Sequence, residues 1–200
     1  MRIKVAALFL ILSIVVPAHA RGPYGSIRVA GWSGGAFTDD RTGQFSNCIA
    51  SATYKSGINF GVVVSSGMTW ALAFNHPNST LVAGQKYPLV LSFDGRNSFN
   101  VDGVAVPGAG IIVPMPDNSA LIQSFRVART MTILSDGKPV QFNLTGTSVL
   151  LPALVTCVKT INESGLNAAG DFTAPIIAAK SAKQVAPPTA ASSLQPNSPQ

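Results

Sequence analysis

The stretch from Lys86 to Gly95 reads KYPLVLSFDG and predicts the kind of fold that this chain adopts. Its large apolar side chains, Tyr87, Leu89, Leu91 and Phe93, alternate with polar or less apolar residues. A period of two places such side chains on one face of an extended strand. The Asp-Gly pair that follows favours a turn. We therefore predict a β-strand with one buried face, ended by a turn.

Short strand patterns recur on both sides of this stretch. The other predicted strands cover residues 45–54, 58–65, 68–74, 98–104, 110–115, 131–134 and 140–144. Turn residues separate them, and the sequence SDGK at 135–138 favours a tight hairpin because Asp-Gly tolerates a positive φ. Strands and turns at such close spacing are typical of antiparallel β-proteins. We predict one mainly β, antiparallel, sandwich-like domain over residues 28–162, preceded by a short flexible segment.

Two segments carry helical patterns instead. Residues 117–119, Asp-Asn-Ser, supply N-cap side chains, and Leu121 and Phe125 follow on one face of the first predicted helix. The second helix begins close to Thr147, because Pro152 is tolerated only near the first turn. We expect both helices to pack on the sheet.

The first twenty residues have the three-part layout of a secretory signal peptide. Arg2 and Lys4 precede an apolar run from Val5 to Val16, and the small residues of Ala18-His19-Ala20 follow, so we predict cleavage after Ala20. The run is shorter than the roughly 20 residues of a spanning helix. We expect a mature chain without a membrane span, in the periplasm or outside the cell. An uncleaved anchor is the alternative.

The two ends of the chain differ in composition from its middle. Ala, Pro, Ser and Gln dominate residues 168–200, which predicts a disordered tail. The net charge is +6, but residues 28–163 hold nine basic and seven acidic residues, a net of +2. Arg126 and Arg129 form the one close basic pair of this span, and no aromatic strip accompanies them. We interpret the pair as the last turn of the first helix and expect no nucleic-acid partner.

Cys48 and Cys157 are the two cysteines of the chain. In an oxidising compartment a lone pair most simply forms one disulfide. Such a bond would tie the second helix to an early strand. Two buried free thiols or one reactive thiol are the alternatives. The mature chain has a single histidine, His76, so cysteine and histidine ligands are too few for a zinc site, and we expect no metal or cofactor.

Residues 31–35, Gly-Trp-Ser-Gly-Gly, match the G-x-S-x-G pattern of a nucleophile elbow. A serine hydrolase using Ser33 would need a strand before it, a helix after it and a histidine partner. The paired glycines oppose a helix, and His76 lies in a turn-prone segment. We interpret the motif as a Gly-rich loop that leads into the first strand.

The acidic residues also lack a catalytic pattern. Asp39 and Asp40 would point to opposite faces of a strand, although in a loop they could converge on a hard cation. Asp94, Asp102 and Asp136 each precede a glycine, which is typical of turns. With no clustered catalytic side chains, we predict that the protein is not an enzyme.

Several of these residues together resemble a known family. They are Trp32, the sequence Phe45-x-x-Cys48, the stretch from Leu81 to Gly95, the segments 125–131 and 142–147, and the helix that carries Cys157. This order resembles the invasion-associated locus B-like proteins, which are small exported proteins of alphaproteobacteria. The resemblance implies a periplasmic or secreted β-rich protein of a host-associated bacterium, with a role at the host interface. It implies no catalytic mechanism.

We therefore expect an exported, non-enzymatic binding or accessory protein. Its partner would be a protein or a cell-envelope ligand, which the sequence does not identify. One alternative is an inhibitor of a host or cell-wall enzyme that acts through an exposed loop at 107–110. Another is a hydrolase that uses Ser33 or a pair of aspartates, although the sequence does not locate such a pair.

Overall fold

The computed structural model describes residues 22–108, 110–135 and 137–177. The predicted signal peptide, with its cleavage after Ala20, lies outside these residues, and so does the predicted tail beyond residue 177. Ten strands form one antiparallel sheet, which confirms the mainly β prediction. The strands are β1 Tyr24–Val29, β2 Trp32–Thr38, β3 Phe45–Thr53, β4 Asn59–Ser65, β5 Trp70–Asn75, β6 Lys86–Phe93, β7 Asn97–Val106, β8 Gly110–Pro114, β9 Thr130–Ser135 and β10 Lys138–Asn143. The helices are α1 Ser119–Val127, α2 Thr147–Ser164 and the 3-10 turn η1 Leu166–Ala168.

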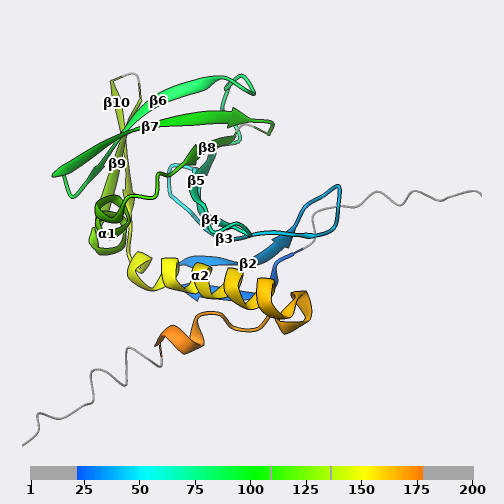
Figure 1. Ribbon diagram of the computed structural model, residues 1–200. Coiled ribbons are helices and arrows are strands. Elements are labelled where there is room, and N and C mark those ends of the chain that lie inside the picture. Colours follow the sequence, from blue (N-terminus) through cyan, green and yellow to red (C-terminus); the bar gives the residue numbers. More distant parts are fainter. Residues whose placement is uncertain (1–21, 109, 136, 178–200) are drawn as a thin grey trace, which may run out of the picture.

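The sheet bends so strongly that its two halves face each other (Figure 1). Its strand order is β1-β2-β3-β4-β5-β8-β7-β6-β9-β10. The bend brings Phe142 of β10 against Phe60 of β4 and Phe74 of β5, with ring centroids 5.1 and 5.3 Å apart. One continuous curved sheet thus produces the sandwich-like arrangement that the sequence predicts.

Helix α2 fills one end of the concave side of this sheet. It begins at Thr147, as predicted, and its buried face includes Leu150, Leu154 and Val158. Cys157 on that face is bonded to Cys48 of β3, so the predicted disulfide is present. Both sulfurs belong to fully buried residues. None of the helices in the described part of the chain combines the length and hydrophobicity needed to cross a membrane.

The N-terminal part of the domain differs from the prediction of a flexible segment and a Gly-rich loop. The residues at 31–35 belong to a tight β1–β2 turn and to β2 itself. Ala30 and Gly31 have φ values of 43° and 90°, as a two-residue hairpin turn requires. A Cβ on Gly34 would lie 1.9 Å from the backbone oxygen of Ile49. The glycine therefore permits the close approach of β2 to β3, and it does not mark a loop.

The described fold extends beyond the predicted boundary at residue 162. The backbone of Ser26 in β1 accepts a hydrogen bond from Phe172 and donates one to Gly170. Phe172 and Thr173 are buried. This segment covers the outer edge of β1, an edge that would otherwise present unpaired backbone groups. The change in composition at residue 168 therefore precedes the last residues that belong to the core.

Candidate functional site

Ser33, the nucleophile in the hydrolase alternative, lies on a strand and faces solvent. It pairs with Arg28 of β1 and Ser51 of β3, and β2 continues as a strand to Thr38. His76 follows β5, which is three positions away from β2 in the sheet. The strand–turn–helix geometry that exposes a nucleophilic serine is therefore absent at this position.

Asp39 and Asp40 lie in the turn between β2 and β3. The Asp39 carboxylate accepts hydrogen bonds from the backbone N–H groups of Thr42 at 2.8 Å and Arg41 at 3.1 Å. The bonds from Thr42 are the main cause that lowers the pKa of Asp39 below its ordinary value. Within the described ranges, no three potential metal ligands lie together. Asp39 thus stabilises a turn.

Asp94 also closes a turn, as the sequence predicts, and it makes a longer-range connection. Its carboxylate accepts hydrogen bonds from the backbone N–H groups of Thr130 at 2.9 Å and Arg129 at 3.0 Å, and from the Thr130 hydroxyl at 3.1 Å. These bonds lower the pKa of Asp94, and the bond from the Thr130 backbone N–H has the largest effect. Asp102 differs from its turn prediction because it lies inside β7. Asp136 lies outside the described residues.

The two arginines interpreted as one helix end occupy different elements. Arg126 is in the last turn of α1, as predicted. The helix ends at Val127 because Ala128 has an extended backbone with ψ near 150°. Arg129 therefore lies in the connection to β9, where its backbone N–H is bonded to Asp94.

The loop at 107–110, which the inhibitor alternative invokes, connects β7 and β8. Val106 pairs with Gly110 on its two sides. The side-chain amide of Asn75 donates a hydrogen bond to the Gly108 carbonyl at 2.6 Å, which ties this turn to the end of β5. Pro107 and Gly108 are exposed.

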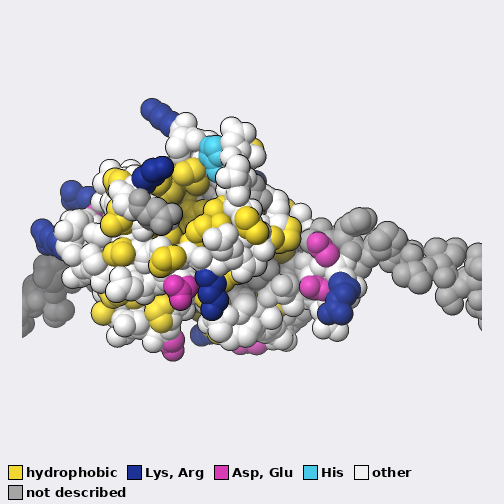
Figure 2. All heavy atoms as spheres, turned by 90° about the horizontal axis from the view of Figure 1, so that it is seen from above, with side chains coloured by type: hydrophobic (Ala, Val, Ile, Leu, Met, Phe, Trp, Pro, Cys, Tyr) yellow, Lys and Arg dark blue, Asp and Glu magenta, His cyan; other side chains and the backbone are white. Residues whose placement is uncertain are grey.

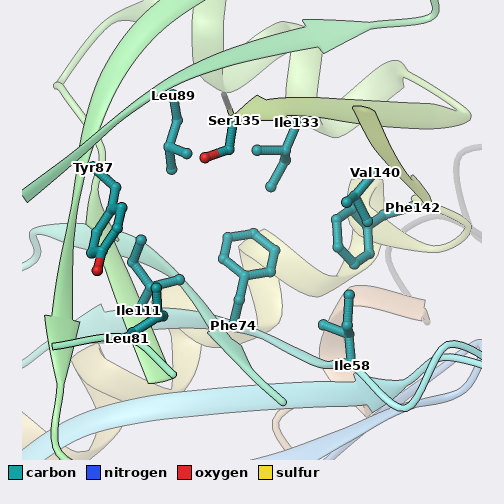
Figure 3. Close-up of a pocket in the computed structure, with 10 residues that line it drawn as sticks. All are labelled: Ile58, Phe74, Leu81, Tyr87, Leu89, Ile111, Ile133, Ser135, Val140 and Phe142. Atoms are coloured by element: carbon teal, nitrogen blue, oxygen red, sulfur yellow. The ribbon is translucent and has the colours of Figure 1, made fainter. Parts of the chain in front are cut away.

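An apolar cavity of about 190 Å³ lies between the two halves of the sheet. Figure 3 shows side chains from β5, β6, β8, β9 and β10 converging on it, together with two residues from connections. Only Ser135 among them lacks an apolar side chain, and the Tyr87 hydroxyl supplies the other polar side-chain atom. The cavity is lined by Ile58, Phe74, Leu81, Tyr87, Leu89, Ile111, Ile133, Ser135, Val140 and Phe142.

The alternating apolar residues of β6 form part of the cavity wall. Tyr87 and Leu89 line it, while Leu91 and Phe93 continue the same face of β6 into the packed core. The predicted buried face of β6 is therefore correct, but its first half borders a hollow space. No local pattern distinguishes these two halves, because both consist of alternating apolar residues.

Aromatic rings form the floor of the cavity. Phe74 stacks on Phe60 with centroids 4.7 Å apart, and Phe142 packs against both rings. Tyr54 meets the Phe142 ring edge-on at 5.1 Å. Burial raises the pKa of the Tyr54 hydroxyl. These contacts close the floor and hold the bend of the sheet in place.

The connection between β5 and β6 forms one side of the cavity. Leu81, which belongs to this connection, is one of the residues that line the cavity. The backbone N–H of Val82 donates a hydrogen bond to the Tyr87 hydroxyl at 3.4 Å, and that hydroxyl donates to the Gln85 side chain at 3.2 Å. Across the cavity, the side chain of Val140 in β10 is 38% exposed (Figure 3). The cavity therefore reaches the surface there.

Comparisons with known proteins add a loose structural relationship. No protein-family model matches the sequence, and no curated protein matches it. Among solved structures, the chain is similar to the crystal structure of invasion associated protein B from Bartonella henselae, with 16% sequence identity and a TM-score of 0.49. The match covers 67% of this chain and 98% of that chain.

Proposed function

We propose that the protein is an exported, non-enzymatic binding protein that holds the apolar part of a small ligand in the cavity between the halves of its sheet. The observation that carries this proposal is the lining, in which apolar side chains from five strands surround about 190 Å³. Ligand sites are typically concave and mostly apolar, with few polar groups. Export is supported by the predicted signal peptide and by the disulfide, which persists in oxidising compartments.

The size of the cavity limits what it can hold. An engineered protein cavity of about 150 Å³ binds benzene, so about 190 Å³ suits one aromatic ring or a short alkyl segment. Whole-ligand sites usually measure about 300 Å³ or more. We therefore expect the remainder of the ligand to extend through the opening beside Val140.

The expected affinity is modest. Burial of six methylene groups contributes about 5 kcal/mol, at about 0.8 kcal/mol for each group. The loss of translational and rotational freedom opposes this term. Because about 5 kcal/mol corresponds to a dissociation constant of about 0.2 mM, we expect a simple alkyl ligand to bind no more tightly than roughly that value.

The positions of the serine and aspartate side chains support binding without catalysis. Ser33 lies on a strand outside the cavity lining, and the Asp39 and Asp94 carboxylates are engaged by backbone N–H groups. The cavity itself offers only the Ser135 and Tyr87 hydroxyls.

Titration of the mature protein with 1-octanol, followed by NMR of the isoleucine methyl groups, tests this proposal. We expect saturable shifts at Ile58, Ile111 and Ile133. Ile133→Phe should fill part of the cavity and weaken binding. Leu134→Phe is the matched control, because Leu134 lies on the opposite face of β9 and is 40% exposed. The absence of saturable shifts in the folded native protein would contradict the proposal.

A further inference from the structure

The charges around the cavity opening define its ligand more closely. We propose that the site binds a monomeric anionic amphiphile, with its apolar end in the cavity and its acidic group beside Lys55 and Lys138. This inference rests on the proposed function. The two lysines come from the two hairpins that border the opening.

Lys138 lies on the cavity side of β10. Val140 and Phe142 line the cavity, and residues two apart in a strand share a face. Lys138 therefore projects from the same face as these two residues, at the outer end of the strand. It pairs with Ser135 of β9, which also lines the cavity. Its side chain is exposed, so its ammonium group is available to a ligand at the opening.

Lys55 lies in the facing hairpin. The turn that contains it is closed by a hydrogen bond of 2.9 Å from the Gly57 N–H to the Tyr54 carbonyl. Ile58, at the end of this turn, lines the cavity. His76 lies beside the same turn, because a Cβ on Gly57 would be 3.4 Å from its Nε2 atom. Each of the two hairpins thus carries one exposed lysine close in sequence to a residue that lines the cavity.

The described acidic residues near these strands point elsewhere. Gly103 of β7 faces Ile111 and Leu89, so its neighbour Asp102 projects from the opposite face. Asp94 is at the far end of β6 and is bonded to Thr130. Figure 2 shows apolar side chains gathered on this face, with a histidine and a basic side chain on one side of them and an acidic side chain next to a basic one on the other.

Neither lysine forms an ion pair with another residue of the described ranges. An acidic group at the end of a bound alkyl chain would therefore meet positive charge that the described protein groups do not neutralise. A neutral amphiphile would gain nothing from this charge, and a cationic one would be repelled. Charge complementarity thus selects an anionic ligand.

The test compares three ligands that share one alkyl chain: octanoate, 1-octanol and octylammonium. Exposed ion pairs are individually weak, so we expect octanoate to bind about three- to ten-fold more tightly than 1-octanol at low salt. Octylammonium should bind most weakly. The preference should shrink as salt rises, because salt screens exposed charges.

Lysine variants locate the charge effect. The double variant Lys55→Gln and Lys138→Gln should remove the preference for octanoate and leave the affinity for 1-octanol unchanged. Lys86→Gln is the matched control, because Lys86 lies on the face of β6 opposite to Tyr87 and Leu89. It should keep the preference.

The outcomes separate this inference from the proposed function. Equal binding of octanoate and 1-octanol would overturn the anionic ligand while leaving the cavity as an alkyl site. A preference that survives in the double variant would overturn the role of the two lysines. Binding of no alkyl ligand would contradict the proposed function itself. Sedimentation with phosphatidylglycerol vesicles without saturable octanoate binding would assign the basic border to a membrane surface and overturn a monomeric ligand.

Discussion

The hydroxyl of Tyr54 donates a hydrogen bond to the backbone carbonyl of Asn143 and so joins the end of β3 to the end of β10. These strands are seven positions apart in the sheet order, and only the curvature of the sheet brings them together. The Tyr54 ring also packs on Phe142, which lines the cavity. The same residue therefore closes the bend and supports the floor of the cavity.

Tyr54→Phe should test this closure without removing the ring. The variant loses one hydrogen bond and leaves the Asn143 carbonyl without it, which costs about 1 kcal/mol of unfolding free energy. Urea denaturation monitored by tryptophan fluorescence measures this loss. An unchanged midpoint would mean that the hydrogen bond contributes nothing to closure.

The same residue predicts a loss of stability at alkaline pH. Because burial raises the pKa of Tyr54 in the folded state, the folded protein holds this proton more tightly than the unfolded chain does. The associated stability is fully present below the unfolded pKa, near 10, and is lost as the pH rises through the folded value. We expect the difference in melting temperature between the native protein and Tyr54→Phe to shrink above about pH 10. A constant difference across this range would contradict the prediction.

Removal of the disulfide should have a much larger effect. Cys48 and Cys157 are 109 residues apart, so their bond strongly restricts the unfolded chain. Loop-closure entropy for a span of this length corresponds to about 4 to 5 kcal/mol. We expect the double variant Cys48→Ala and Cys157→Ala to lose a comparable unfolding free energy, measured by urea denaturation without reductant. A loss below about 1 kcal/mol would show that the unfolded chain is already compact.

Local sequence patterns account for most of the elements of this fold. The alternation from Tyr87 to Phe93 predicts β6, and the SDGK sequence predicts the β9–β10 hairpin, because both depend on neighbouring residues. The Gly-rich segment at 31–35 misleads, since Gly31 belongs to a hairpin turn and Gly34 permits a close approach between strands. That approach involves Ile49, which is distant in sequence from Gly34.

The cavity could not be predicted from the same patterns. Alternation indicates which face of β6 is buried, but it does not indicate whether the opposing wall touches that face. The gap depends on the curvature of the whole sheet and on contacts such as Phe142 with Phe74. The placement of Lys55 and Lys138 at one opening likewise requires two hairpins that lie far apart in the sequence.

Asp94→Asn should weaken the junction between β6 and β9. Asn tolerates the positive φ of 49° at this position, so the substitution mainly removes the negative charge that accepts bonds from Arg129 and Thr130. We expect a lower melting temperature at pH 7. Because the folded pKa of Asp94 is lowered, its contribution is present above the unfolded pKa and is lost as the pH falls through the folded value. The two proteins should therefore converge in stability below about pH 4, and a difference that persists in acid would contradict this origin.

Gly103→Ala should connect the packing of β7 to the volume of the cavity. An added Cβ would lie 2.4 Å from the Cδ1 atom of Ile111 and 3.1 Å from that of Leu89, so both side chains must move. Both line the cavity, and their displacement should reduce its affinity for 1-octanol. Overpacking of this kind costs about 1 to 3 kcal/mol of unfolding free energy.

Gly67→Ala is the control for this substitution. Gly67 has an ordinary negative or extended φ, and a Cβ there would have only the Ser65 hydroxyl oxygen nearby, at 3.8 Å. It should leave both the stability and the affinity for 1-octanol close to native. If Gly103→Ala reduced stability while 1-octanol bound as in the native protein, Ile111 and Leu89 would have moved away from the cavity. Such a result would separate the packing of β7 from the binding site.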